Sequence, residues 1–308
     1  MYHVTRIDET QNQVPAAYAD RSRGFSRQLL VGSSTGSPHM GLFVCHLEPT
    51  GQIEAVVHSF EVSLYVLSGD LVVSLLGESV RLPTDHCLNV PVGVAYTVRA
   101  AGGPTSWLQM SAPAPFEDDR RSDTFFTGEQ LGTDEAPAPD LRDPRNRNAF
   151  RFDPSSMDLG NLAGIAGGQA VNAPTVSASM ATALLAYSGI GVRMLVDQRM
   201  GAQLHTMFMV QYQPTAIAHP HDHPFEEAYI FVEGEVHALV EGDELVLRPG
   251  DVLWAGVGAD HGFHNRGDGL VRWIETQAPR PPAQHSYRFN RDWEYLAETL
   301  GNGDAEAR

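Results

Sequence analysis

The chain concentrates metal-binding side chains in one short segment, His219-Pro-His221-Asp-His223-Pro-Phe-Glu226-Glu227. Residues i and i+2 of a β-strand point to the same side, so His221 and His223 are expected to project together. A turn directly after His223 can bring Glu227 back to the same point, and His261 offers a further imidazole. Two or three imidazoles and one carboxylate suit a first-row divalent metal that keeps open coordination positions.

An internal repeat indicates which elements must position these groups. Sliding the sequence by 165 positions takes Glu61 onto Glu226 and Gly69 onto Gly234. Glycines and a Pro-Thr turn carry most of the match, and these are the residues that a shared backbone demands. Each copy consists of short β-rich runs between turn signals, which predicts an antiparallel jelly roll.

The predicted strands divide the chain into two units. The first copy predicts strands over 41–48, 63–68, 71–76, 80–82, 87–90 and 96–99, and the second over 191–196, 204–212, 228–232, 236–240, 244–247, 252–254 and 270–276. A short helix is predicted near the end, from Asn290 to Gly301. We therefore expect an N-terminal barrel with an arm over 1–112, a Pro-rich and Gly/Ala-rich linker over 113–187, and a metal-binding barrel with a tail helix over 188–308.

The composition argues against several classes of partner. Lys and Arg number 21 against 38 Asp and Glu, a formal net charge of −17, and such a chain repels nucleic-acid phosphates. No stretch approaches the roughly 20 apolar residues of a membrane span, and the N-terminus lacks the pattern of a signal peptide. Cys45 and Cys87 lie outside any CxxC motif and are expected to be buried, reduced thiols. We expect a cytoplasmic protein without nucleic-acid or membrane partners.

The metal-binding segment resembles the first motif of the cupin superfamily, G(X)5HXH(X)3-4E(X)6G. The matching residues are His221, His223, Glu227 and Gly234, whereas the leading glycine is replaced by Ala216 or a neighbour. The resemblance implies a double-stranded β-helix barrel, and because the repeat spans about 40–112 and 188–279, it implies a bicupin, an all-β protein of two tandem jelly-roll barrels.

The second cupin motif, G(X)5PXG(X)2H(X)3N, is matched by Gly258, His261 and Asn265, with Gly256 at its proline position. The resemblance implies one divalent metal per chain, Mn or Fe in the first place and Zn or Ni as alternatives. It implies as ligands His221, His223, Glu227 and His261, with His219 as a rival if the register shifts.

The first copy departs from the cupin pattern. The repeat places Val56, His58, Val62 and Tyr96 at the four ligand positions, so one ligand of four is kept. We therefore predict that the N-terminal barrel is degenerate, binds no metal and serves as scaffold or dimer surface, and we expect a homodimer.

Three further residues are candidates for catalysis. Glu275 and Gln277 lie on the last predicted strand, where alternation could aim both at the metal. Tyr229 is a third candidate, although packing inside the barrel is the competing interpretation for it. His58, His205, His237 and His264 are expected to be ordinary core or surface histidines.

The resemblance leaves several activities open, because a fold alone does not select a reaction. The expected function is that of an Fe(II)- or Mn(II)-dependent, dioxygenase-like oxidoreductase acting on a small organic acid or ring, as in gentisate-type dioxygenases. The alternatives are a metal-dependent hydrolase, isomerase or decarboxylase, of the (S)-ureidoglycine aminohydrolase kind, and a non-catalytic small-molecule-binding cupin.

Overall fold

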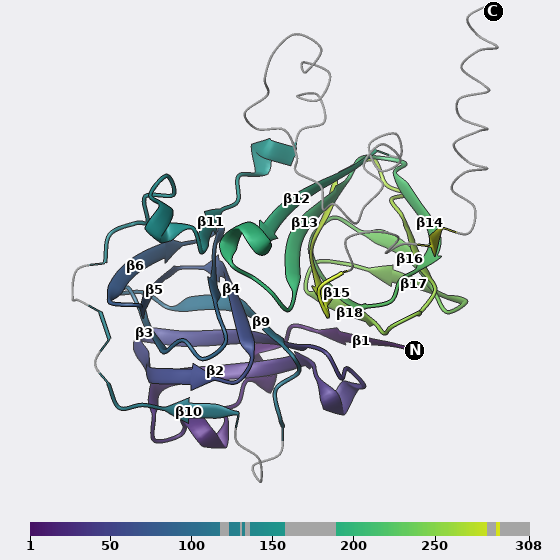
Figure 1. Ribbon diagram of the computed structural model, residues 1–308. Coiled ribbons are helices and arrows are strands. Elements are labelled where there is room, and N and C mark those ends of the chain that lie inside the picture. The colour runs from purple at the N-terminus through teal and green to yellow at the C-terminus, as the bar shows by residue number, and fades with distance from the viewer. Residues whose placement is uncertain (118–122, 130, 133–135, 158–188, 282–287, 290–308) are drawn as a thin grey trace, which may run out of the picture.

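The computed structural model describes residues 1–117, 123–129, 131–132, 136–157, 189–281 and 288–289, and two barrels lie side by side in it (Figure 1). The predicted tail helix and the Gly/Ala-rich part of the linker lie outside the described residues. The described helical segments are 3₁₀ turns: η1 (Glu9–Gln11), η2 (Ala16–Tyr18), η3 (Ser33–Thr35), η4 (Pro144–Asn146), η5 (Pro154–Met157) and η7 (Gln198–Met200).

The N-terminal barrel is one continuous ten-stranded sheet, in the order β11-β7-β4-β9-β3-β8-β5-β6, with β2 and β10 both added to β3. It can curl into a barrel because β3 is long and pairs with β9 along one half and with β8 along the other. The strands are β2 (Ser22–Val31), β3 (Gly41–His58), β4 (Glu61–Ser68), β5 (Asp70–Leu75), β6 (Glu78–Pro83), β7 (His86–Val90), β8 (Tyr96–Ala100), β9 (Thr105–Ala112), β10 (Thr124–Phe126) and β11 (Ala149–Arg151).

The C-terminal barrel has two sheets, β1-β18-β15-β20-β13-β12 and β17-β16-β19-β14-β21. The strands are β12 (Ile190–Val196), β13 (Thr206–Tyr212), β14 (Ile217–Asp222), β15 (Glu226–Glu233), β16 (Val236–Val240), β17 (Asp243–Leu247), β18 (Asp251–Ala255), β19 (His261–His264), β20 (Val271–Ala278) and β21 (Arg288–Phe289). The region equivalent to β3 is divided here into β13 and β14, one in each sheet.

Two segments cross the predicted domain boundaries. The N-terminal arm forms β1 (Tyr2–Arg6), which pairs antiparallel with β18 and so extends the C-terminal barrel. The segment predicted as a linker supplies β10 and β11 to the N-terminal sheet. The strand β1 therefore joins the two barrels in addition to their direct contact.

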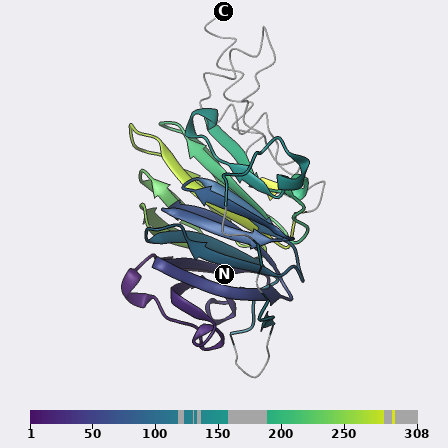
Figure 2. The same ribbon diagram turned by 90° about the vertical axis from the view of Figure 1, so that its left-hand side faces the viewer.

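Burial divides the apolar residues into three cores. One fills the N-terminal barrel, one fills the C-terminal barrel, and a third joins side chains of both halves, including Met40, Trp254 and Ile274. Both cysteines are buried free thiols. The side view of Figure 2, which looks onto the N-terminal half, shows the strands stacked in layers around these cores.

The two barrels contact each other through residues that occupy equivalent positions in the two copies of the repeat. Glu61 on β4 is almost completely buried and accepts hydrogen bonds from the backbone N–H groups of Gln203 and Leu204. Its counterpart Glu226 on β15 is equally buried and accepts from the hydroxyl of Ser37 at 2.6 Å. Each barrel thus extends one buried glutamate to the segment that precedes the long strand of the other.

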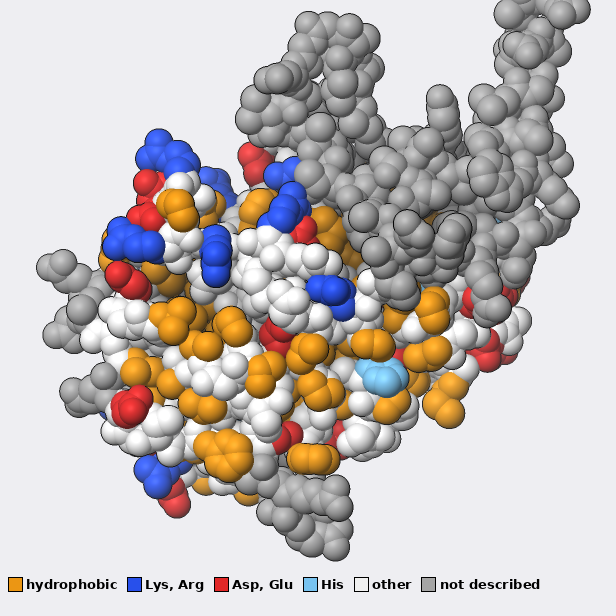
Figure 3. Space-filling model, in the orientation of Figure 1, with side chains coloured by type: hydrophobic (Ala, Val, Ile, Leu, Met, Phe, Trp, Pro, Cys, Tyr) orange, Lys and Arg blue, Asp and Glu red, His pale blue; other side chains and the backbone are white. Residues whose placement is uncertain are grey.

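Several surface arginines form ion pairs with neighbouring carboxylates. Figure 3 shows basic and acidic side chains interleaved near β6 and β11 on one face, where Arg142 pairs with Asp140 and Arg145 with Asp143. Among the residues that the structure describes, no helix is long and apolar enough to cross a bilayer.

Candidate metal centre

Three histidines converge inside the C-terminal barrel. His221 lies on β14, His223 follows that strand, and His261 opens β19 directly opposite His221 in the strand pairing. All three are buried, and one ring nitrogen from each lies within 4.8 Å of the others. This clustering follows from the alternation of β14 and from the pairing of β14 with β19.

Backbone carbonyls orient the three rings. The Nδ1 atom of His221 lies 2.7 Å from the carbonyl oxygen of His219, that of His223 lies 2.8 Å from Phe225, and that of His261 lies 2.9 Å from Ala259, each carbonyl two residues away. A carbonyl can only accept, so each Nδ1 carries a proton, and Nε2 is the ring atom of each histidine that is turned toward the cluster. Such a bond fixes the tautomer of a metal-binding histidine.

Glu227, near the start of β15, adds a carboxylate to the three histidines. Its Oε2 atom lies 2.7 Å from Nε2 of His223 and 3.3 Å from Nε2 of His261. Burial would raise the pKa of Glu227, but His223 and His261 outweigh it and hold the pKa well below its ordinary value. Three imidazole nitrogens and a carboxylate facing one point fit a divalent first-row metal.

Two neighbours hold the carboxylate in place. The amide of Gln277 donates to Oε1 of Glu227 at 2.6 Å, and the hydroxyl of Thr206 donates to Oε1 of Gln277 at 3.1 Å. The hydroxyl of Tyr229 donates to Oε2 of Glu227 and lies 2.8 Å from Nε2 of His261. The structure therefore places the predicted residues Gln277 and Tyr229 in contact with the predicted ligands.

Glu275 lies beside this group on the same face of β20 as Gln277. It is buried, and Nε1 of Trp273 donates to it at 3.0 Å. Burial first, and then the charge of Glu227, raise the pKa of Glu275 well above its ordinary value. Its environment thus favours the protonated carboxyl more than water does. The rings of Tyr229, Phe263 and Trp273 pack against one another, and Tyr229 lies opposite Glu275 in the strand pairing.

The remaining histidines lie elsewhere. His219 acts through its carbonyl oxygen, and the group of converging nitrogens does not include it. His205 lies between the barrels, with Nε2 2.7 Å from the hydroxyl of Ser63, and burial lowers its pKa to about 3. His237 and His264 pair across β16 and β19, on the outer face of the sheet.

The N-terminal barrel has different chemistry at the equivalent positions. Val56 and Val62 are buried in its apolar core. His58 turns Nε2 toward the hydroxyl of Tyr96 at 3.1 Å and Nδ1 toward the hydroxyl of Thr124 at 3.0 Å. Burial lowers the pKa of His58 to about 3, so this imidazole is neutral. The single retained histidine is engaged by hydroxyl groups, and two of the other ligand positions carry valine.

Sequence comparisons match the C-terminal barrel. A family model described as the cupin domain matches residues 208–276. Among curated proteins, the tetracenomycin polyketide synthase protein TcmJ of Streptomyces glaucescens is 29% identical over 96 residues, which is 30% of this chain and 64% of that protein. The chain thus matches slightly less than two thirds of that relative.

Solved structures match both barrels. Oxalate decarboxylase from Bacillus subtilis superposes with a TM-score of 0.63 at 15% identity, covering 97% of this chain and 82% of that chain. Salicylate 1,2-dioxygenase from Pseudaminobacter salicylatoxidans gives a TM-score of 0.61 at 15% identity, covering 79% and 71%. These likenesses extend the match from one domain to a two-barrel fold.

Proposed function

We propose that this chain is a metal-dependent enzyme of the cupin superfamily with its active site in the C-terminal barrel, because a cupin-domain model matches residues 208–276 and the fold resembles two-barrel cupins over both halves. The observation that carries the proposal is the orientation of His221, His223 and His261, whose Nδ1 atoms are all engaged by backbone carbonyls. Burying three imidazole nitrogens and a carboxylate that face one point would cost free energy if no cation were bound there.

We propose Fe(II) or Mn(II) as the metal, with Zn or Ni as the alternatives. The carboxylate of Glu227 supports this choice, because an oxygen ligand among imidazoles suits the harder ions of the series. When bound, such a metal would orient a chelating substrate, act as a Lewis acid and support redox chemistry with O₂.

The residues of the chain would control the site in four ways. Gln277 holds the Glu227 carboxylate at the metal position, and Tyr229 holds a proton at its hydroxyl between Glu227 and His261. Glu275, a buried carboxyl group whose pKa is raised, would form a hydrogen bond with a polar group of the substrate. The packed rings of Tyr229, Phe263 and Trp273 would favour an apolar substrate body beside it.

We therefore propose a dioxygenase-like oxidoreductase that acts on a small organic acid or ring compound. Salicylate 1,2-dioxygenase, a protein of the same fold, acts by its name on such a compound. The homodimer and the cytoplasmic location stay predictions from the sequence.

Elemental analysis of the purified protein, together with oxygen uptake over small organic acids and phenols, tests the proposal. About one Fe or Mn per chain is expected, with loss of the metal in His221→Ala/His223→Ala. The matched control is His237→Ala/His264→Ala, which removes two outward-facing histidines and should keep the metal.

Each contrary result overturns a distinct part of the proposal. Zn or Ni, with turnover that consumes no O₂, would replace oxidation by hydrolysis, isomerisation or decarboxylation. No metal even after reconstitution would make the protein a non-catalytic binding cupin. Two metals per chain would overturn the prediction that the N-terminal barrel is empty.

A further inference from the structure

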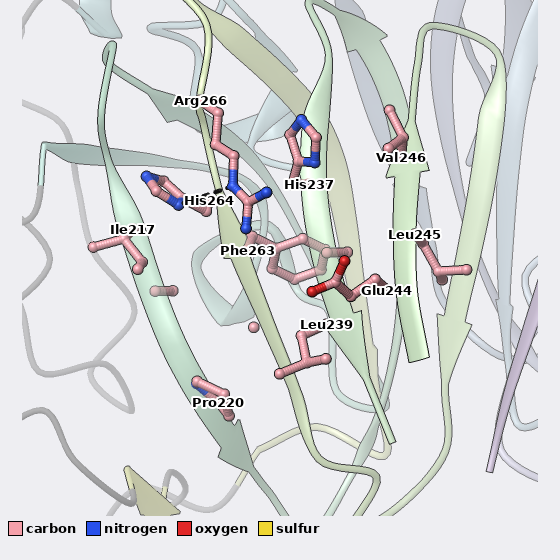
Figure 4. A pocket seen from close by; sticks show the side chains of 13 residues that line it. Ile217, Pro220, His237, Leu239, Glu244, Leu245, Val246, Phe263, His264 and Arg266 are labelled. Carbon is pink, nitrogen blue, oxygen red and sulfur yellow. Dashed lines mark hydrogen bonds between the residues drawn. The ribbon is translucent and has the colours of Figure 1, made fainter. Parts of the chain in front are cut away.

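The outer face of the metal-bearing sheet contains a hollow of about 380 Å³, bounded by β14, β16, β17 and β19 (Figure 4). No member of the histidine cluster lines it, although Pro220 and Gly262 in its wall directly precede or follow ligands on β14 and β19. The hollow is therefore separated from the metal position by one thickness of sheet. Its volume lies within the range of small-molecule pockets.

The walls of the hollow are mostly apolar. Leu239 and Val246 are 37% and 39% exposed at its rim, an unusual position for large aliphatic side chains, and Ile217 and Pro220 line the opposite side. Gly262 lies between them, and a Cβ there would meet the carbonyl oxygen of Ala218 at 2.8 Å and the backbone nitrogen of Pro220 at 2.9 Å. The floor of the hollow is therefore a close approach of β14 to β19 that needs glycine at this position.

The guanidinium group of Arg266 lies at one end of the hollow. Arg266 lines the hollow next to His264 (Figure 4), and its Nε donates to Nδ1 of His264 at a long 3.4 Å. No carboxylate of the described residues forms an ion pair with Arg266. Its terminal nitrogens, which favour planar bidentate acceptors, are thus directed to the hollow without an acidic partner.

A carboxylate limits what else can bind. Glu244 lines the same hollow from β17, across from Arg266. A ligand with one anionic group can place it at Arg266, whereas a second anionic group would approach Glu244 and be repelled.

We propose that this hollow binds an apolar monocarboxylic acid, with its carboxylate on Arg266 and its hydrocarbon body between Ile217 and Leu239. The site is distinct from the metal centre and does not depend on the function proposed above. The shared strands β14 and β19 make the outer site a neighbour of the metal, so the two must be separated by experiment.

Isothermal titration calorimetry of the full chain with naphthalene-2-carboxylate tests the proposal. We expect saturable binding of one equivalent, which Arg266→Gln weakens about tenfold, since a charge-assisted pair is lost. Naphthalene-2,6-dicarboxylate is expected to bind more weakly than the monoacid because of Glu244. Arg21→Gln is the matched control, since Arg21 is an exposed arginine paired with Glu54 far from the hollow.

The metal-free state distinguishes the two sites. Binding should persist after removal of metal with EDTA and in His221→Ala/His223→Ala, provided that the variant is folded by circular dichroism. Loss of binding in both would place the probe at the metal and overturn the proposal. Absence of saturable binding, or equal affinity in wild type and Arg266→Gln, would overturn it as well.

Discussion

Gln277 offers the sharpest test of the metal centre, because its amide donates to Glu227 and it is not one of the proposed ligands. Replacing it by Met removes the amide that donates to Oε1 of Glu227 at 2.6 Å and leaves the side-chain volume nearly unchanged. The carboxylate then keeps Tyr229 as a donor but can rotate away from the metal position. We expect weaker metal binding in a folded barrel.

The magnitude follows from the kind of bond that is lost. A hydrogen bond to a charged acceptor contributes about 1.5–3 kcal/mol. Removal of an outer partner of a metal ligand lowers affinity by roughly 10–100-fold, which is about 1.4–2.7 kcal/mol. Since these two ranges overlap, the expected loss for Gln277→Met is about 30-fold in Kd for Mn(II) or Zn(II).

Competition with a chromophoric chelator measures this Kd, and urea unfolding of the metal-free protein supplies the second readout. Gln211→Leu is the matched control. Gln211, on β13, also has a buried side-chain amide, which donates to the carbonyl oxygen of Met157 at 3.0 Å. Both variants should lose stability, but only Gln277→Met should lose metal affinity. Equal affinity in wild type and Gln277→Met would refute the role assigned to this contact.

Three further predictions concern other parts of the molecule. Burial lowers the pKa of His58 to about 3, so the unfolded chain alone takes up a proton below about pH 6.5. Stability should therefore fall by up to about 1.4 kcal/mol per pH unit from pH 6.5 toward 3, and urea unfolding should show a shallower fall in His58→Phe. Glu61→Ala leaves the backbone N–H of Gln203 without this acceptor, so its free energy of unfolding in urea should be about 2 kcal/mol lower than that of Glu61→Gln. Equal free energies of unfolding would contradict this. Tyr229→Phe should keep one metal per chain but lower kcat of oxygen uptake about a hundredfold, whereas an unchanged kcat would mean that Tyr229 only packs against Glu227.

The repeat made the strands predictable, because turn residues and alternation are local signals. The strand over 236–240 has the predicted bounds. The arm that forms β1 was not predicted as a strand, since its partner β18 lies far away along the chain and no local pattern encodes a distant pairing. The short strands β10 and β11 depend on the N-terminal sheet in the same way.

The site was predictable where it depends on side-chain type and spacing. His221, His223, Glu227 and His261 were selected by spacing, and the structure brings them together. The carbonyls that orient the rings could not be predicted, because every residue has a carbonyl and only the folded geometry selects three of them. The hollow at Arg266 was not expected either, since no motif marks the outer face of a sheet.

The two copies of the repeat carry different side chains inside the barrels but equivalent side chains at the interface between the barrels. Glu61 and Glu226 occupy equivalent positions, and both cross to the opposite half. The next residue in each copy points into its own barrel, where Val62 lies in apolar surroundings and Glu227 faces the histidines. Because successive residues of a strand face opposite sides, one strand can keep the interface while its inner face changes independently.

This alternation lets the N-terminal barrel help to hold the strand that carries Glu227. Glu226 is anchored by Ser37 of the N-terminal half, and it is joined through one peptide bond to Glu227. A displacement of the interface therefore moves the backbone that carries the carboxylate. Since Gln277 and Tyr229 restrain that carboxylate from the other side, its position depends on both barrels at once. The N-terminal half thus helps to fix β15, which carries Glu227, and its described residues add no side chain to the histidine cluster.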